Sequence, residues 1–316
     1  MYNVTGFLSS AQDGARAAML ALMNSPWLQE VSRVAAGIRR QVLSHVLRNG
    51  GGYMSQACSS AETLATLYTR VLNLGPSQAP AVPPAFSGVP SRTNPSPWHG
   101  GRYNGPREPG MDRFYFSPVH YSLCLYAALI EVGRLAPEAL DRFNEDGSTV
   151  EMIGAEHSPG VESTAGSLAQ TLSVAAGAAL ARRIKGEPGR VWVYMTDGEF
   201  QEGQTYEALA AAAHHKLGNL GAYVDVNGQQ CDGAMADVMG VEPLAQRVAA
   251  FGAKVREVDG HDAQALAAPA EEPMDQRPLI VLARTDPCRG VELLRARAPR
   301  LHYLRLKDQQ ERQAYA

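Results

Sequence analysis

The chain has 316 residues, of which 45% are hydrophobic, and a formal net charge of −3. This length and apolar content suffice for a substantial core, and the lack of a basic surplus argues against nucleic acid or an acidic membrane surface as a partner. No apolar run reaches the ~20 residues of a membrane-spanning helix and no secretory signal precedes the first helix, so the expected location is the cytoplasm.

The first part of the chain is predicted to be helical. Helices are expected over residues 14–23 and 27–48, and residues 1–30 are interpreted as an N-terminal helical extension. A glycine-rich turn then leads through Tyr53 into a third predicted helix at 61–72.

Residues 75–110 are rich in Pro, Gly, Ser and Asn and show no apolar periodicity. A stretch of this length and composition indicates a loop insertion, either a functional lid or a mobile surface loop. Within it, Trp98, His99 and Tyr103 either reach the mouth of a site or fasten the loop to the surface.

Two segments after the loop place polar or small residues at helix starts. Residues 112–133 predict a strand, a turn and a helix that begins near His120, whose side chain either caps the helix or contacts a ligand. Residues 157–181 contain a glycine turn before a long helix of small residues, which allows close approach of a ligand or of another helix.

The central part of the chain predicts a strand–helix–strand crossover. One apolar run, residues 191–195, ends at Asp197-Gly198, and a second, residues 220–226, ends at Asn227-Gly228. The alanine-rich segment 206–216 between them reads as a helix, and strands at 254–258 and 278–285 follow beyond a helix at 243–251. This pattern predicts an α/β fold with a parallel sheet, in which the two polar turns meet at the carboxyl edge.

The chemistry of the two turns indicates a metal-held diphosphate. Asp197 offers a carboxylate oxygen and Asn227 an amide oxygen, which suit Mg²⁺ shared with a phosphate group. The predicted helix start after Gly198 adds free N–H groups and a positive dipole end. Either dipeptide alone would be an ordinary loop turn, whereas both around one helix favour the ligand interpretation. The four cysteines are widely separated and form no CxxC pair, so no zinc site or disulfide framework is predicted.

These residues also carry a resemblance to a known family. A DG motif followed thirty residues later by an Asn resembles the thiamine diphosphate signature, and the words DGE, QEGQ, YEA and AAAHHKL closely resemble transketolases. The resemblance spans about residues 43–306 and is dense after Ser158. It implies one thiamine diphosphate-binding domain over residues 1–316, with helices on both faces of the sheet, and Mg²⁺ (or Ca²⁺ or Mn²⁺) as the metal.

The resemblance assigns roles to individual residues. The metal ligands would be Asp197, Asn227 and the backbone carbonyl of Gln229, and the catalytic residues His120, Glu202 and His302. Glu202 and Glu207 would lie at a subunit contact, and Cys231, near the thiazolium, is expected to be a small buried thiol. The implied cofactor contacts are His120, Gly166, Leu168, Asp197, Gly198, Glu199, Glu202, Asn227, Gln229 and Cys231.

The chain departs from the transketolase pattern on the substrate side. Tyr53 stands where the family has a substrate-side His, and is either a substrate contact or an exposed aromatic beside a helix cap. The His of the family's GHP word has no clean counterpart, and His157 either replaces it or does not. His302 or Tyr303 occupies the place of a cofactor-side His, and Ala169 replaces a family glycine.

The resemblance also implies a function. The chain ends about where transketolases pass into the pyrimidine-binding domain, whose Glu activates the cofactor. We therefore predict the diphosphate-binding subunit of a two-component transketolase, which moves a two-carbon ketol unit from a ketose donor to an aldose acceptor through a thiamine-bound intermediate. A second subunit would carry the pyrimidine-binding and C-terminal domains, with an α2β2 assembly expected.

Two alternatives to this function stay open. One is a subunit of another thiamine diphosphate enzyme, either a decarboxylating 2-oxoacid dehydrogenase or an acyloin-forming ligase. The other is a degenerate, non-catalytic scaffold subunit.

Overall fold

The fold is built on one parallel sheet. The structure, a computed structural model, describes residues 25–316, so the helix expected at 14–23 lies outside the described part. Five strands pair in the order β2-β3-β4-β8-β7, and every pair is parallel. The strands are β2 (Arg113–Phe116), β3 (Val191–Thr196), β4 (Leu220–Val226), β7 (Lys254–Asp259) and β8 (Leu279–Arg284). The predicted α/β class with a parallel sheet is confirmed.

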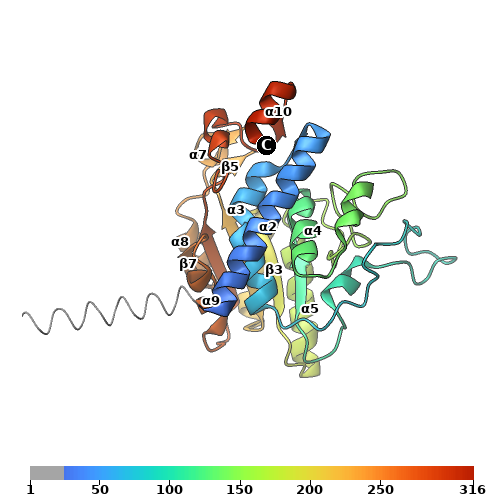
Figure 1. Ribbon diagram of the computed structural model, residues 1–316. Coiled ribbons are helices and arrows are strands. Elements are labelled where there is room, and N and C mark those ends of the chain that lie inside the picture. Colours follow the sequence, from blue (N-terminus) through green and yellow to red (C-terminus); the bar gives the residue numbers. More distant parts are fainter. Residues whose placement is uncertain (1–24) are drawn as a thin grey trace, which may run out of the picture.

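Helices cover both faces of this sheet (Figure 1). One face packs against α2 (Pro26–Asn49), α3 (Met54–Thr66), α4 (Ser122–Glu131) and α9 (Ala263–Glu271). The other packs against α5 (Gln170–Lys185), α6 (Gly203–His214) and α8 (Leu244–Ala250). Side chains along β3 alternate between the two cores, with Trp192 and Tyr194 in the first and Val193 and Met195 in the second. Since alternate strand residues face opposite sides, both faces of β3 are apolar and its sequence reads as one continuous apolar run.

The predicted helix at 61–72 begins earlier than expected. The observed α3 starts at Met54, and a π-helical segment, η1 (Leu67–Val71), continues it. The first turns of α3 are rich in Ser and Gln, and these polar side chains are buried. Ser55 donates to the Leu301 carbonyl at 2.7 Å and Ser59 to the Asp225 carboxylate at 2.6 Å. The buried side of this segment is therefore polar, and these two hydroxyls are hydrogen-bonded to distant residues. For this reason the sequence shows no apolar periodicity there, and the helix start is not predicted.

The long loop at 75–110 is largely irregular, with one short 3-10 helix, η2 (Gly100–Asn104). The Tyr103 side chain is buried in the core cluster that also contains residues of α2, α3 and α4, and its hydroxyl donates to the Pro80 carbonyl at 2.8 Å within the loop. Trp98 donates through its indole N–H to the His157 carbonyl at 3.1 Å. Both aromatics therefore fasten the loop to the body of the protein, the second of the two interpretations above.

The remaining elements are short. A two-residue antiparallel ladder joins β1 (Gly51–Gly52) to β9 (Leu304–Arg305), which brings Tyr53 beside the C-terminal segment. Figure 1 shows β5, α7 and α10 gathered at one end of the molecule. The short elements not yet given are β5 (Gln229–Gln230), β6 (Gly233–Ala234), α7 (Met235–Met239), α10 (Gln309–Tyr315) and the 3-10 helices η3 (Val119–Tyr121), η4 (Pro137–Arg142), η5 (Asp197–Gln201) and η6 (Glu292–Arg297). None of the helices in residues 25–316 is both long and apolar enough to cross a membrane.

Candidate active site

The two predicted polar turns meet at the carboxyl edge of the sheet. Thr196 of β3 lies opposite Asp225 of β4, so Asp197 and Asn227 follow neighbouring strand ends. The Asp197 carboxylate is 2% exposed and accepts a hydrogen bond from the Gly228 backbone N–H at 2.8 Å. The sequence-predicted pair of turns is thus one structural unit.

The Asn227 side chain is held in a fixed orientation. Its Nδ2 donates to the Tyr121 hydroxyl at 2.9 Å and to Asp225 Oδ2 at 3.0 Å. These bonds identify the opposite atom, Oδ1, as the acceptor side of the amide. Among the described residues, it accepts one hydrogen bond, from the Gln229 N–H at 2.8 Å. An amide oxygen presented in this way suits a hard cation.

Asp225 and Tyr121 were not singled out from the sequence. Asp225 is fully buried and accepts bonds from Ser59 and Thr285 as well as from Asn227. Burial raises the pKa of Asp225 above its usual range, and its hydrogen bonds oppose that shift. A charged residue inside the apolar run 220–226 was the available signal, because a buried carboxylate needs several donors.

The Gln229 carbonyl also faces away from its hairpin partner. Met235 N donates to the Gly228 carbonyl at 2.8 Å, and Gln229 pairs with Ala234 in the next position. Hydrogen-bonded and non-hydrogen-bonded pairs alternate in an antiparallel ladder, so Gln229 and Ala234 form a non-hydrogen-bonded pair. The N–H and the carbonyl of Gln229 therefore both point away from the partner strand, and the N–H bonds the Asn227 side chain.

The residues of this edge fit a divalent cation and a diphosphate. Burial, followed by the charge of Asp225, raises the pKa of Asp197 to about 7, and no Lys, Arg or His of residues 25–316 forms an ion pair with Asp197. The side-chain oxygen Oε1 of Gln229 is buried and has no hydrogen-bond partner among residues 25–316. A bound metal ion would supply the positive charge that the buried Asp197 carboxylate lacks and a partner for polar oxygens at this edge.

No group of three or more His, Cys, Asp or Glu side chains suited to a metal occurs in the described part of the chain. The predicted ligand set does not require such a group, because it contains one carboxylate and completes its oxygens from an amide, a carbonyl and phosphate.

The turn after β3 differs from the predicted helix start. Residues Asp197–Gln201 form the 3-10 helix η5, and the α-helix begins only at Gly203. Glu199 is completely buried and accepts bonds from the Thr196 N–H at 2.8 Å and from the Ser117 hydroxyl. Burial raises the pKa of Glu199 to about 7. Its carboxylate therefore holds the turn in place, and only the backbone of Glu199 is available to a ligand.

Three ring-bearing candidates on the substrate side come together. The Tyr53 ring centroid lies 5.9 Å from His120 and 5.4 Å from His302, and the two imidazoles are 5.5 Å apart. Tyr303 lies 5.0 Å from Tyr53, so both alternatives for the cofactor-side position belong to this cluster. Burial, followed by the charge of His302, lowers the pKa of His120 to about 4. Burial also lowers the pKa of His302, so both imidazoles are neutral near pH 7.

Cys231 is exposed, which corrects the expectation of a buried thiol. It lies at the tip of the β5–β6 hairpin, outside the sheet, so no core packs over it. Burial, then Tyr303 and then Cys231, raise the pKa of Tyr53, which places the thiol in the neighbourhood of the ring cluster.

The glycine turn before α5 presents an open surface. Gly166 is exposed and Leu168 is 37% exposed. Because Leu168 is exposed just before the start of α5, its side chain can offer an apolar contact to a ligand.

His157 lies outside the ring cluster. Its ring packs on Phe86 at 4.5 Å, and its Nε2 is 3.0 Å from the Glu151 carboxylate, although not in hydrogen-bond geometry. Its contacts attach the long loop to the body of the protein and do not join it to His120 or His302.

Glu202 and Glu207 are both exposed near the start of α6. Glu207 lines an apolar groove of about 300 Å³ between α5 and α6. The groove is otherwise lined mainly by small and aliphatic side chains, among them Ala176, Gly177, Leu180 and Ala211.

Comparison with known proteins defines first a class of domain. Residues 98–294 match the thiamine diphosphate binding domain of transketolase. A solved transketolase of Pichia stipitis superposes with a TM-score of 0.67 at 22% identity, over 88% of this chain and 39% of that one. A transketolase of Campylobacter jejuni superposes with a TM-score of 0.64, over 81% of this chain and 38% of that one.

The sequence relatives then define the family. The chain is 35% identical to a transketolase family protein, y4mO, of Sinorhizobium fredii, over 86% of this chain and 90% of that protein. It is 29% identical to the 6-deoxy-6-sulfo-D-fructose transketolase subunit SqwG of a Clostridium species, over 80% and 83%. An apulose-4-phosphate transketolase subunit of Actinobacillus succinogenes is also 29% identical, over 87% and 90%. The chain belongs to the transketolase family.

Proposed function

We propose that this chain is the diphosphate-binding subunit of a two-component transketolase, which transfers a two-carbon ketol unit from a ketose donor to an aldose acceptor. The observation that carries the proposal is the buried Asp197 carboxylate, joined to the Asn227 turn through the Gly228 N–H at 2.8 Å. Relatives of similar extent that are named as transketolase subunits support the two-component form.

In this proposal the sheet edge anchors the cofactor. Asp197, Asn227 and the Gln229 carbonyl hold Mg²⁺ (or Ca²⁺ or Mn²⁺), and the backbone of Gly198 and Glu199 approaches the diphosphate. Thiamine diphosphate, when bound, supplies the carbanion-stabilising chemistry, while the protein supplies placement and proton control.

The neighbouring residues would act on the substrate side. Neutral His120 and His302 each have one donor and one acceptor nitrogen, so they can orient a substrate hydroxyl or a diphosphate oxygen. Gly166 and Leu168 would line the ring region of the cofactor, with Cys231 at its edge. The contribution of His157 as a replacement for the family His stays a prediction, since its contacts lie with the long loop.

The chain would complete its site with a second subunit. That subunit would carry the pyrimidine-binding and C-terminal domains, and Glu202, Glu207 and the apolar α5–α6 groove would meet it. Glu202 would act from that contact by linking the cofactor sites. We treat the chain as one domain, because both cores pack on one sheet. The α2β2 stoichiometry and the cytoplasmic location stay predictions.

The metal assignment has a direct test. Replacement of Asp197 by Ala removes the only carboxylate of the proposed ligand set, so Mg²⁺-dependent binding of thiamine diphosphate should be lost in calorimetry. An equal charge change at the exposed Asp146, as Asp146→Ala, is the matched control and should leave the affinity unchanged. Unaltered affinity in a correctly melting Asp197→Ala variant would refute the assignment.

A different thiamine reaction is the second candidate, favoured by Tyr53 in place of the family His at the centre of the ring cluster. The two-subunit complex should be screened with phosphorylated and unphosphorylated ketoses and aldoses, and separately with pyruvate. Ketol transfer that requires an aldose supports the transketolase, whereas CO2 release from pyruvate without an aldose supports a decarboxylase. Cofactor binding without turnover of any substrate would favour the scaffold.

A further inference from the structure

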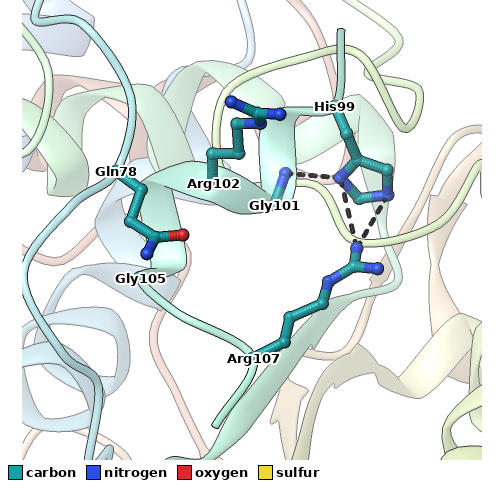
Figure 2. A pocket seen from close by; sticks show the side chains of 6 residues that line it. All are labelled: Gln78, His99, Gly101, Arg102, Gly105 and Arg107. Carbon is teal, nitrogen blue, oxygen red and sulfur yellow. Dashed lines mark hydrogen bonds between the residues drawn. The ribbon is translucent and has the colours of Figure 1, made fainter. Parts of the chain in front are cut away.

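A second cavity, of about 570 Å³, lies within the long loop at 75–110 (Figure 2). Its volume falls within the range of ordinary small-ligand pockets, about 300–1,000 Å³. It is lined by Gln78, His99, Gly101, Arg102, Gly105 and Arg107. None of these residues belongs to the Asp197–Asn227 edge or to the ring cluster, so the cavity is a separate feature.

Two donors compete for one acceptor at the wall of this cavity. The Gly101 N–H donates to His99 Nδ1 at 2.9 Å, and Arg107 Nη2 lies 3.1 Å from Nε2 and 3.4 Å from Nδ1. Figure 2 shows the Arg107 side chain pointing at this ring. Burial, and then Arg107, lower the pKa of His99, so its ring is neutral and has a single lone-pair nitrogen. With Gly101 on that nitrogen, Nε2 carries the proton and faces the guanidinium as a second donor.

The nearby Glu162 carboxylate forms an ion pair with Arg107 and also with Arg113, so one negative charge faces two guanidinium groups. Glu162 Oε2 is 3.4 Å away from Arg107, which is a long contact. The Glu162 side chain is 2% exposed and already pairs with Arg113, and it accepts from Asn104 at 3.2 Å. Its single negative charge is therefore shared with a second, buried guanidinium.

The other polar side chains of the cavity add donors and no anion. The Arg102 guanidinium lies 5.6 Å from the Trp98 ring and forms no ion pair with any residue of 25–316. Gln78 contributes an amide from the wall opposite His99 (Figure 2). The cavity thus collects two guanidinium groups, an imidazole N–H and an amide around an open space.

We infer that this cavity binds an oxyanion of the phosphate type, either inorganic phosphate or the phosphoryl group of a small metabolite. One anionic oxygen that bridges Arg107 Nη2 and His99 Nε2 from the cavity side accepts from both donors and removes their conflict. Guanidinium groups recognise phosphate through paired, charge-assisted N–H bonds.

Backbone hydrogen bonds hold the cavity wall against the segment that precedes the Gly166 turn. Gly100 N donates to the Glu156 carbonyl at 2.7 Å, and Gly160 N donates to the Gly100 carbonyl at 3.0 Å. These bonds join the cavity wall to residues 156–160, which precede the exposed turn at Gly166.

The test is calorimetric titration of the full-length chain with inorganic phosphate, with glycerol 3-phosphate and with glycerol. Each titration is run with and without thiamine diphosphate and Mg²⁺, so that phosphate at the cofactor edge is recognised by its competition with the cofactor. We expect saturable binding of both phosphate compounds and none of glycerol. Tighter binding of the ester identifies a metabolite as the source, and equal or weaker binding identifies free phosphate.

Variants locate the bound anion. Arg107→Gln removes a charged donor and should weaken binding about tenfold or more, and Gln78→Ala should weaken it without a change of charge. Arg92→Gln, an equal change at an exposed arginine of the same loop, is the matched control and should leave the affinity unchanged. Absence of saturable binding, or equal weakening by Arg92→Gln and Arg107→Gln, would overturn the inference. If Arg107→Gln lowers the melting temperature, the Gln78→Ala variant provides the test instead, because Gln78 is exposed and its replacement should not affect folding.

Discussion

Tyr53 is the residue at which this chain departs most directly from its family. Its ring lies within 6 Å, centroid to centroid, of His120, His302 and Tyr303. A phenol at this position fills more space than an imidazole and offers its hydroxyl from a different point, so it should select a different substrate.

Replacement of Tyr53 by His is expected to shift substrate preference. The family residue should raise kcat/KM for ordinary ketose donors by about tenfold and lower it for the native donor, as measured in the two-subunit complex. Tyr53→Phe keeps the ring and loses only the hydroxyl, so it separates shape from hydrogen bonding. Identical donor profiles for all three proteins would contradict a substrate role.

His45 makes stability depend on pH. Asn49 Nδ2 donates to His45 Nε2 at 3.0 Å, and the buried Nδ1 has no hydrogen-bond partner in the part of the chain that the structure describes. Burial, and then the charge of Arg48, lower the pKa of His45 to about 4. The unfolded chain binds this proton near pH 6.5, so the contribution of His45 is fully present above pH 6.5 and is lost as the pH falls toward 4.

Urea unfolding at pH 7 and pH 5 checks this dependence. Wild-type protein should lose about 1–2 kcal/mol more of its free energy of unfolding between the two pH values than His45→Gln does. His215→Gln, at an exposed histidine, is the control and should follow the wild type. Parallel losses in wild type and His45→Gln would rule out this role.

At the residue scale, the sequence predicted the site residues that directly follow strand ends, and it did not predict the site residues that lie within strands and helices. Asp197 and Asn227 were visible because each interrupts an apolar run. Tyr121 was not, because its role depends on a contact with Asn227, 106 positions later in the chain. Asp225 carried a signal as a charged residue inside an apolar run, but its donors Ser59 and Thr285 lie 166 and 60 positions away. Cys231 was misjudged because nothing in the sequence shows whether a hairpin tip is covered.

At the scale of elements, the start of α5 has an unusual backbone. Ala169, where the family has glycine, adopts φ 66° and ψ −1° at the N-cap of the helix. The left-handed conformation costs a residue with a Cβ about 1–2 kcal/mol, partly offset because alanine loses less conformational entropy than glycine on folding.

Two glycine substitutions in or beside α5 should therefore differ in sign. Ala169→Gly is expected to leave the free energy of unfolding unchanged or raise it by up to about 1 kcal/mol. Ala181→Gly, at an exposed interior position of the same helix, should lower it by about 1 kcal/mol. Chemical denaturation measures both, and equal destabilisation would show that Ala169 is not strained.

The elements predicted best were those with long, uniform patterns. β4 was expected at residues 220–226 and occurs there, and α2 differs from its prediction by one residue at each end. The start of α3 was missed because buried hydroxyls bond distant partners, and the start of α6 because the capped 3-10 turn at Asp197–Gln201 precedes it.

At the scale of the whole molecule, the parallel sheet followed from the central crossover, but the strand order did not. β8 lies between β4 and β7, so the chain passes over one position and returns. Local periodicity contains no record of such a pairing. The same applies to the ladder of β1 with β9, which brings Tyr53 and His302 into one cluster.

The α5–α6 groove offers a test of the proposed association with a second polypeptide. It is an apolar groove between the two helices, with Ala211 exposed along it and Glu207 in its lining. A surface of this kind is stabilised when a partner covers it. An arginine side chain introduced there would fill the apolar groove and bring a charged group that must lose its water when a partner covers it, even if it pairs with Glu207 one turn earlier, and this opposes association.

Ala211→Arg should therefore prevent co-purification with the partner polypeptide and abolish ketol transfer at low concentrations of both chains. Activity should return in part when the partner is in large excess, because the substitution weakens association and leaves the cofactor edge intact. Ala36→Arg, at an exposed position of α2 on the opposite face of the sheet, is the matched control and should behave as the wild type. Light scattering after gel filtration measures the assembly. The assignment of this face to the partner would be refuted by an undisturbed Ala211→Arg complex, or by turnover of the isolated wild-type chain.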